Sequence, residues 1–241
     1  MNALIGHTGF VGSNISEQKE FDFFYNSKNI DDIKGMKFDL IVCAGVSGIK
    51  WKANKFPKED YKQIMNLVQN LNEVEFDKMV LISTGSVYDN PADNSYGRNR
   101  LYLETYLTNN YDNLTIVRLP SLFGNNLKKN ALYDLLNNDF DYLPHIKSTF
   151  QFYDLSDIWK DINVAMDNNL KITNFGTEPM KFTNVLDLFS VDYNKISDDR
   201  PILREDIRTV NASYWNKDGN YLYSNKEMFH KLKQFVDKND N

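Results

Sequence analysis

Residues 2–12 read Asn2-Ala3-Leu4-Ile5-Gly6-His7-Thr8-Gly9-Phe10-Val11-Gly12, an apolar run that passes directly into three glycines. A strand followed by glycines and then by a helix is a more specific pattern than the glycines alone. Glycine permits a tight turn and a close approach of the backbone, and the first turn of a helix offers free N–H groups to an anion. We predict that a pyrophosphate binds here, at Gly6, Thr8, Gly9, Phe10, Val11 and Gly12. A tight turn without a ligand is the alternative.

Outward from this turn, short apolar runs alternate with amphipathic stretches, the pattern of a parallel sheet that helices cover on both faces. Strands are predicted at residues 2–5, 21–25, 39–43, 78–83 and 114–119. Helices are predicted at residues 59–74, 95–109, 127–138, 156–166 and 225–236, with an aromatic segment at 150–153 and a strand-like segment at 171–175. The sequence therefore predicts a doubly wound α/β fold. We expect a nucleotide-binding domain at 1–124 and a small substrate-side region at 125–241 that partly returns to the sheet.

The connection between the second and third predicted strands is short. A parallel crossover needs about a dozen residues. Residues 26–38 therefore have room for one crossover, where a full dinucleotide-binding sheet has two. We predict that the sheet lacks the third strand of the standard order or reduces it to a stub.

Composition and charge exclude several classes of function. The formal net charge of −5 repels phosphate backbones, and no strong basic patch compensates for it. No apolar segment approaches the ~18 residues of a membrane span, and residues 1–5 do not resemble a secretory signal. The single cysteine, Cys43, cannot form an internal disulfide, and the three histidines lack partners at metal-ligand spacing. We expect a cytoplasmic protein without a metal site that binds neither nucleic acid nor membranes.

The end of the second predicted strand bears on the choice of dinucleotide. An acidic residue there binds the ribose 2′-hydroxyl, whereas a basic or small polar group tolerates a 2′-phosphate. Here the chain reads Asn26-Ser27-Lys28, and no carboxylate occurs before Asp31. This favours NADP(H) modestly over NAD(H). In the alternative interpretation Lys28 is a solvated loop charge.

Two later segments are candidates for the chemistry: Ile82-Ser83-Thr84-Gly85-Ser86-Val87-Tyr88 and Tyr96-Gly97-Arg98-Asn99-Arg100. Together with the glycine turn, with Ala44-Gly45 and with Arg118-Leu119-Pro120-Ser121-Leu122-Phe123-Gly124, they resemble the extended short-chain dehydrogenase/reductases. These are NAD(P)-dependent nucleotide-sugar epimerases, dehydratases and reductases. The resemblance covers the first half of the chain well and the second half loosely. It implies a Rossmann-type sheet, with further cofactor contacts from Cys43, Ala44, Gly45 and Pro120.

The resemblance also implies the catalytic roles. Tyr96 would give or take the proton of a carbonyl or carbinol, and Thr84 would hydrogen-bond the same oxygen. A free tyrosine titrates near ~10, so this work needs a nearby cation, which in the family is a lysine four residues later. The matching residue here is Arg100, whose broad, planar guanidinium is not equivalent to an ammonium. The alternative is that Tyr96 packs in a core while Arg100 pairs with Glu104.

The same resemblance narrows the reaction. Dehydratases of the family follow the threonine with an acidic pair, whereas this chain has Gly85-Ser86. We therefore expect a reductase or an epimerase. Substrate contacts are predicted for Ser86, Arg118 and Lys52, although a solvated loop is the more usual interpretation of the lysines of residues 50–55.

Because the chain is shorter than most relatives, the substrate is smaller or a partner subunit completes the pocket. A homodimer through the tyrosine helix would use Tyr102 and Tyr106, unless these are core residues. Two other classes stay open: a catalytically impaired relative that binds dinucleotide as a sensor or structural ligand, and a binding module without a cofactor.

Overall fold

The computed structural model describes residues 1–239, and the chain divides by packing into two compact units. The first unit comprises Met1–Leu119 and Ile158–Thr173, and the second comprises Pro120–Asp157 and Asn174–Asn241. The first unit therefore contains every predicted catalytic residue.

The first unit is built on a six-stranded sheet with the order β2-β1-β3-β4-β5-β9. Every pairing among the first five strands is parallel. The strands are β1 (Asn2–Ile5), β2 (Phe23–Tyr25), β3 (Lys37–Cys43), β4 (Glu75–Thr84), β5 (Leu114–Leu119) and β9 (Ile172–Asn174). Parallel pairing brings the carboxyl ends of the first five strands to one edge of the sheet.

The predicted shortening of the sheet is confirmed. Within residues 1–239, β2 is an edge strand of this sheet. Where a third strand and a second crossover would lie, the chain forms only the 3₁₀ helix η1 (Ile30–Ile33), and β3 then pairs with the other side of β1. The short connection leaves no length for more, because a crossover alone consumes it.

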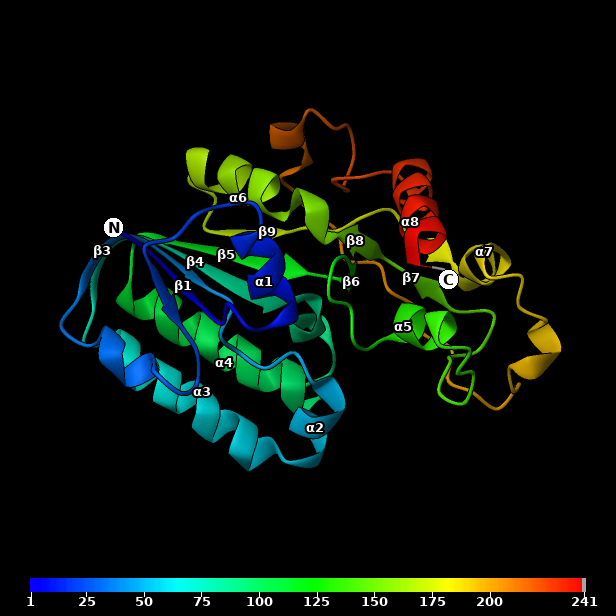
Figure 1. The fold of residues 1–241 in the computed structure, drawn as a ribbon, viewed down its shortest axis with the longest axis horizontal. Helices are drawn as coiled ribbons and strands as arrows, with labels where there is room; N and C mark the ends of the chain where they lie inside the picture. Colours follow the sequence, from blue (N-terminus) through cyan, green and yellow to red (C-terminus); the bar gives the residue numbers. More distant parts are fainter. Residues whose placement is uncertain (240–241) are drawn as a thin grey trace. The chain divides into compact units, whose positions relative to one another are not determined.

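Helices cover both faces of the sheet, so the doubly wound prediction is confirmed (Figure 1). One face carries α3 (Pro57–Leu71) and α4 (Ser95–Asn110), and the other carries α1 (Phe10–Ser16) and α6 (Ile158–Asp167). The short helix α2 (Lys50–Lys55), where sequence analysis expected a loop, buries only Ala53. No helix within residues 1–239 combines the length and the apolarity that crossing a membrane requires.

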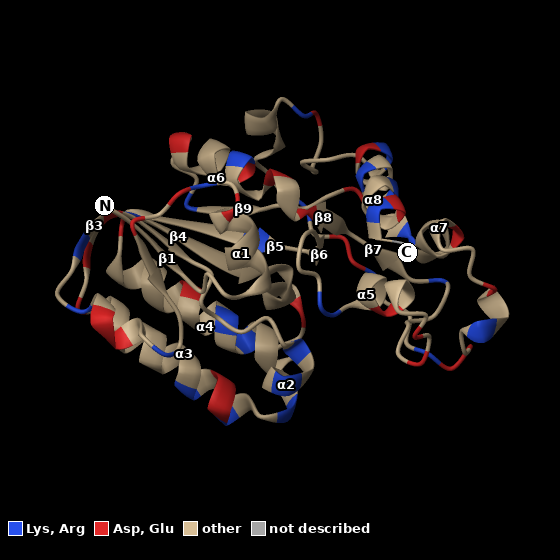
Figure 2. Ribbon diagram, in the orientation of Figure 1, with Lys and Arg blue, Asp and Glu red and all other residues tan. Residues whose placement is uncertain are grey.

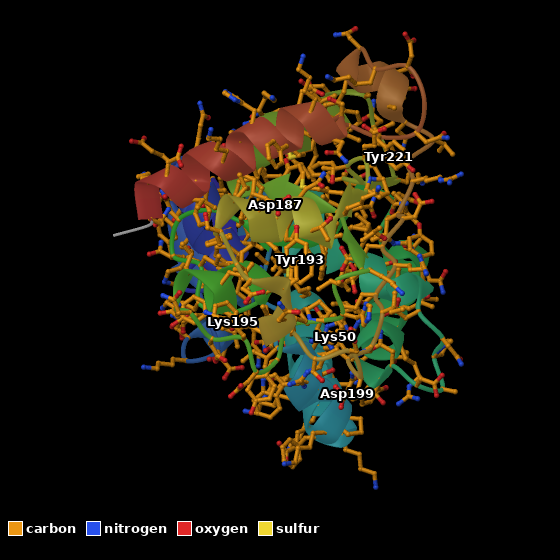
Figure 3. All side chains as sticks on the ribbon, turned by 90° about the vertical axis from the view of Figure 1, so that its right-hand side faces the viewer. Lys50, Asp187, Tyr193, Lys195, Asp199 and Tyr221 are labelled. Atoms are coloured by element: carbon orange, nitrogen blue, oxygen red, sulfur yellow. The ribbon has the colours of Figure 1, made fainter. Side chains whose placement is uncertain are left out.

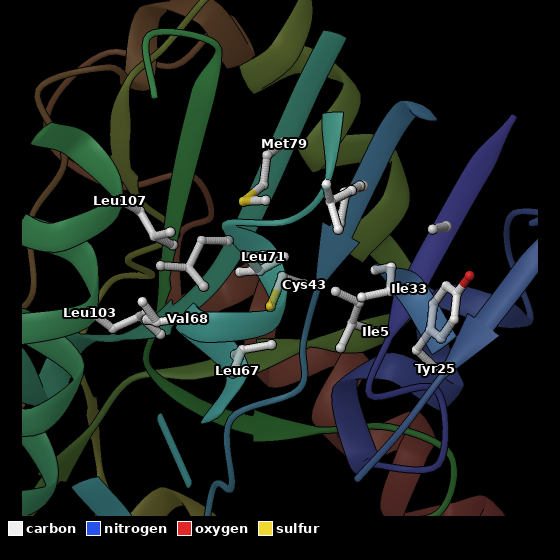
Figure 4. Close-up of a cluster of buried hydrophobic side chains, with 14 of the residues drawn as sticks. Ile5, Tyr25, Ile33, Cys43, Leu67, Val68, Leu71, Met79, Leu103 and Leu107 are labelled. Atoms are coloured by element: carbon white, nitrogen blue, oxygen red, sulfur yellow. The ribbon is translucent and has the colours of Figure 1, made fainter. Parts of the chain in front are cut away.

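A large cluster of core residues of the first unit lies between the sheet and the α3–α4 layer (Figure 4). The apolar face predicted for α3 is buried as expected, with Ile64, Leu67, Val68 and Leu71 all in the core. Leu103 and Leu107 of α4 complete the layer. Each fully buried aliphatic side chain contributes about 1.5–3 kcal/mol relative to exposure, so this layer anchors the helix that carries Tyr96.

The second unit holds two small sheets: β6 (Ser121–Phe123) pairs in parallel with β8 (Phe152–Asp154), and β7 (Thr149–Phe150) pairs antiparallel with β10 (Met180–Lys181). Its helices are α5 (Ala131–Leu136), α7 (Phe182–Leu188) and α8 (Asn225–Asn239). The helix α5 is shorter than predicted because the side chain of Asn130 caps it, accepting the N–H groups of Leu132 and Tyr133. Tyr193 donates a hydrogen bond to Asp187 of α7 (Figure 3).

Candidate active site at the carboxyl edge of the sheet

The segments singled out in the sequence follow the strands of the first unit at its carboxyl edge. The glycine turn follows β1, Ala44-Gly45 follows β3, and Thr84 ends β4. Ligands of open α/β folds bind outside this edge. A surface cavity of about 450 Å³ lies instead at the amino ends of β3 and β4, lined by Lys37, Glu75 and Asn113 among others. The candidate site is therefore the carboxyl edge of the sheet, where the candidate residues lie.

Two of the three glycines are required by the turn itself. Gly6 has a φ of +87°, and a Cβ there would lie 2.3 Å from the Ala44 carbonyl oxygen. A Cβ at Gly12 would lie 2.1 Å from the Gly6 carbonyl oxygen. At Gly9 a Cβ would meet only the Gly6 oxygen, at 3.2 Å, and the residue is exposed. Packing thus explains Gly6 and Gly12, whereas Gly9 is exposed and a Cβ there would meet a single backbone atom.

The helix after the turn offers unpaired donors. Gly9 is the N-cap of α1, and no side chain caps the helix. The first N–H groups of a helix have no partner within it, so those of Phe10 and Val11 are left to a ligand or to water. Thr8 is exposed beside them. The turn therefore presents backbone donors to the surface without competition from a side chain.

The predicted dinucleotide-selecting residues form a tight turn after β2. Asn26 Oδ1 accepts the N–H of Lys28 at 2.8 Å, and the N–H of Asn26 donates to Asn29 Oδ1 at 2.7 Å. This geometry leaves Ser27 and Lys28 exposed. None of the four residues 26–29 is acidic.

The other predicted cofactor contacts lie in different surroundings. The Cys43 side chain is fully buried in the core, and this burial raises the pKa of its thiol to about 11 (Figure 4). A contact from Cys43 to a ligand would therefore run through its backbone. Gly45 is exposed and Ala44 half-buried, directly beside the glycine turn. Pro120 opens the second unit, and its contact stays a prediction.

The start of α4 brings the two catalytic segments together. Gly97 faces the Ser86 carbonyl so closely that a Cβ would lie 1.9 Å from its oxygen. The N–H of Tyr96 donates to Asn54 Oδ1 of α2 at 2.8 Å. Thr84 Oγ1 accepts the N–H of Ser86 at 3.1 Å, which starts the 3₁₀ helix η2 (Gly85–Tyr88). Glycine at 97 is thus what allows the tyrosine helix to approach η2, the segment that follows Thr84.

Arg100 stacks on Tyr96 and pairs with Asp60. The guanidinium carbon lies 3.8 Å from the centroid of the Tyr96 ring. Its Nη1 and Nη2 donate to the two Asp60 oxygens at 2.5 and 2.9 Å, and Nη2 also donates to the Ser47 carbonyl at 2.5 Å. Arg100 is 3% exposed and Asp60 7%. The alternative prediction, in which Arg100 pairs with Glu104, is therefore wrong.

Glu104 instead binds Arg118. Arg118 donates through Nε and Nη2 to the Glu104 carboxylate, and through Nη1 to the Tyr88 hydroxyl at 2.7 Å. Burial alone would lower the pKa of Arg118, but the hydrogen bond and charge of Glu104 raise it overall. Arg118, predicted to contact substrate, is therefore held to α4 by an ion pair and to η2 by the hydrogen bond to Tyr88.

The lysines of α2 lie on its surface (Figure 2). Lys52, the predicted substrate contact, is exposed. Lys50 Nζ donates to Ser86 Oγ at 3.1 Å and to Asp89 Oδ2 at 2.9 Å, so this lysine reaches the other predicted substrate residue (Figure 3). The sequence does not distinguish Lys50 from the neighbouring lysines, because Lys50 and Ser86 are 36 residues apart and no sequence pattern links them.

Asp60 is the site residue that sequence analysis missed, although a signal for it existed. It lies four residues before Ile64 on the apolar face of α3. A carboxylate on the core-facing side of an amphipathic helix is almost never buried without a partner. That position indicates a buried cation on a neighbouring element, and the cation is Arg100.

Neither a protein-family model nor a curated relative matches the sequence. Solved structures do match. A UDP-N-acetylglucosamine 4-epimerase from Methanobrevibacter ruminantium, in complex with UDP-N-acetylmuramic acid, has a TM-score of 0.74 at 12% identity, over 98% of this chain and 96% of that one. A dTDP-4-dehydrorhamnose reductase from Clostridium acetobutylicum has a TM-score of 0.72 at 16% identity, over 99% of both chains.

A dTDP-glucose 4,6-dehydratase double mutant from Streptomyces venezuelae, with NAD bound, has a TM-score of 0.73 at 12% identity, over 99% of this chain and 97% of that one. All three likenesses extend over nearly the whole chain, although sequence resemblance was clear only in the first half. The fold implied by the sequence resemblance is therefore confirmed, and the protein has the fold of the extended short-chain dehydrogenase/reductases.

Proposed function

We propose that this protein is an NAD(P)-dependent reductase or epimerase that acts on a carbonyl or carbinol of a sugar-nucleotide-like substrate. The observation that supports it most is the approach of the tyrosine helix to the segment after Thr84, at the same sheet edge as the glycine turn. The solved structures of the same fold include an epimerase, a reductase and a dehydratase of nucleotide sugars. Gly85-Ser86 in place of an acidic pair favours the first two reactions.

The glycine turn fits a dinucleotide pyrophosphate. Gly9 is exposed and has no side chain, which lets a ligand approach the backbone, and the uncapped start of α1 supplies N–H donors. A bound nicotinamide dinucleotide would donate or accept the hydride. The exposed Lys28 and the absence of a carboxylate in its turn support NADP(H) over NAD(H). Lys28→Ala should then weaken NADP(H) binding and leave NAD(H) binding unchanged in calorimetric titrations.

Proton transfer in this proposal belongs to Tyr96 and Thr84. The Tyr96 hydroxyl makes no hydrogen bond within residues 1–239, and its ring is half-buried, so the oxygen is available to a substrate. Thr84 Oγ1 accepts one backbone N–H, which leaves its own proton to donate to the same substrate oxygen. Tyr96 would then give or take the proton while Thr84 orients the oxygen.

The test is Tyr96→Phe, assayed on nucleotide sugars selected by thermal shift. We expect turnover to fall about 10²–10⁴-fold, the usual contribution of a positioned proton donor, with dinucleotide affinity retained. The matched control is Tyr102→Phe on the same helix, where the side chain is exposed. Undiminished turnover in Tyr96→Phe would refute the mechanism. Absence of dinucleotide binding by the purified protein would refute the cofactor proposal.

A homodimer through α3 and α4 is part of the same proposal. Tyr102 packs edge-on against Tyr61, and both rings are more than one-third exposed, at 38% each. Tyr106 is engaged within the subunit, because its hydroxyl exchanges hydrogen bonds with Asn72. Sedimentation equilibrium of the wild type and of Tyr61→Ser/Tyr102→Ser would test the dimer, which the double substitution should weaken.

A further inference from the structure

We propose that Asp60 is a positioning residue, which holds the Arg100 guanidinium over the Tyr96 ring and so sets where the Tyr96 hydroxyl points. The inference rests on the proposed function, in which that hydroxyl handles the substrate proton. It assigns Arg100 a role as a rigid platform for the tyrosine.

Arg100 uses most of its hydrogen-bond donors within the protein. A guanidinium has five N–H groups, and four of them belong to the two Nη atoms. Two of those four bind the Asp60 oxygens, one binds the Ser47 carbonyl, and one binds the Tyr96 carbonyl at 3.1 Å. Only the Nε–H is left. Arg100 therefore has no spare pair of donors with which to hold a ribose.

The Asp60 carboxylate fixes the plane of the Arg100 guanidinium. A bidentate carboxylate fixes the orientation of the fork as well as its position. The carboxylate is itself oriented, because Asn99 Nδ2 donates to Asp60 Oδ2 at 2.8 Å and to the Pro57 carbonyl at 3.1 Å. With its plane fixed, the guanidinium is held over the Tyr96 ring, with its carbon 3.8 Å from the ring centroid. A cation on a ring face attracts the ring, and burial strengthens that attraction.

A lysine could not replace Arg100 in this arrangement. An ammonium is a compact charge that cannot both fork onto Asp60 and stack on a ring. In this protein Arg100 and Asp60 therefore work as one unit, and replacing only Arg100 by lysine breaks the platform. Arg100→Lys should lower turnover, whereas a site that had merely lost a family lysine would gain turnover from the same change.

The first test needs neither substrate nor cofactor. The full chain is labelled with 3-fluorotyrosine, and the Tyr96 fluorine resonance is assigned by its loss in Tyr96→Phe. We expect Asp60→Asn and Arg100→Lys each to shift and broaden that resonance. Leu107→Ala, a core change at the far end of α4, should lower stability without moving it. An unmoved Tyr96 resonance in Asp60→Asn would overturn the proposal.

The second test is kinetic. Asp60→Asn should lower kcat about 10–100-fold, the cost of a misoriented catalytic group, with dinucleotide Kd changed less than about twofold. Asp60→Asn/Arg100→Lys should be no worse than the poorer single variant, because both break one unit. If Asp60→Asn does not fold, Asp60→Glu takes its place and should retain part of kcat. A gain of turnover in Arg100→Lys would overturn the proposal. If the wild type shows no turnover at all, the proposed function fails, while the fluorine resonance still decides the role of Asp60.

Discussion

The Glu104 carboxylate of α4 receives the Nε–H of Arg118 at 3.1 Å and an Nη2–H of the same guanidinium at 2.5 Å. Ser83 of β4 donates to the same carboxylate at 2.5 Å. This ion pair binds the ends of two neighbouring strands to the tyrosine helix. Each arginine near the site therefore has its own acidic partner: Arg118 pairs with Glu104, and Arg100 pairs with Asp60.

Glu104→Gln should destabilise the protein by about 3 kcal/mol, because it leaves the Arg118 charge mostly buried without a counter-ion. Glu104 is 2% exposed, so water cannot replace the lost carboxylate. Urea unfolding at pH 7 measures the loss. Glu104→Met/Arg118→Met should recover most of it, and an additive loss in the double variant would contradict this account.

Gly9→Ala and Gly12→Ala should separate ligand binding from folding. In Gly12→Ala the new Cβ would lie 2.1 Å from the Gly6 oxygen, so the backbone must shift, at a cost of about 1–3 kcal/mol. Gly9→Ala would meet that oxygen at 3.2 Å, which requires a shift of only a few tenths of an ångström, so its melting temperature should fall much less than that of Gly12→Ala. The dinucleotide affinity of Gly9→Ala should fall about tenfold, because the added methyl keeps the pyrophosphate away from the backbone and lengthens its hydrogen bonds to the start of α1. Calorimetry would contradict the site if Gly9→Ala bound normally.

Cys43 should report unfolding. Burial raises the pKa of its thiol from 9.0 to about 11, so the reactive thiolate is scarce in the folded state at pH 8. Iodoacetamide labelling should therefore be slow in buffer and accelerate with urea. The unfolded chain loses this proton first, so the contribution of Cys43 to stability declines as pH rises from about 9 towards about 11. Rapid labelling of the native protein would show that Cys43 is accessible.

Ser224 and Glu227 form a capping box at the start of α8, in which each side chain hydrogen-bonds the backbone N–H of the other. Burial raises the pKa of Glu227, but its bonds to Lys217 and Ser224 outweigh this and lower it from 4.5 to about 2. The resulting stability is present above pH 4.5 and is lost as pH falls towards about 2.

Glu227→Gln keeps the capping geometry but loses the charge. It should cost about 1 kcal/mol at pH 7, a modest value because the pair is partly exposed, and nothing near pH 2. Thermal unfolding at both pH values measures the difference. An equal loss at both pH values would place the effect in the hydrogen bonds alone.

Much of the first unit was predictable because its signals are local or periodic. Gly6 and Gly12 mark a turn whose backbone tolerates no side chain, and the face of α3 follows helical spacing. The missing strand followed from the length of residues 26–38 alone. The second unit was less predictable, since α5 begins where the Asn130 side chain caps it, inside a longer amphipathic stretch.

The sequence by itself therefore determined the sheet, its shortened edge and the glycine turn, because chain length, periodicity and steric exclusion act over a few residues. Only the tertiary structure decided which acid pairs with which arginine. Asp60 and Arg100 are 40 residues apart, whereas Glu104 is four residues from Arg100 on the same helix. Helical spacing permitted the nearer acid, although in the less favourable base-before-acid order. The packing of α3 against α4 instead placed the Asp60 carboxylate within hydrogen-bond distance of both Nη atoms of Arg100. Burial of both groups then makes that geometry the one that avoids an unpaired charge.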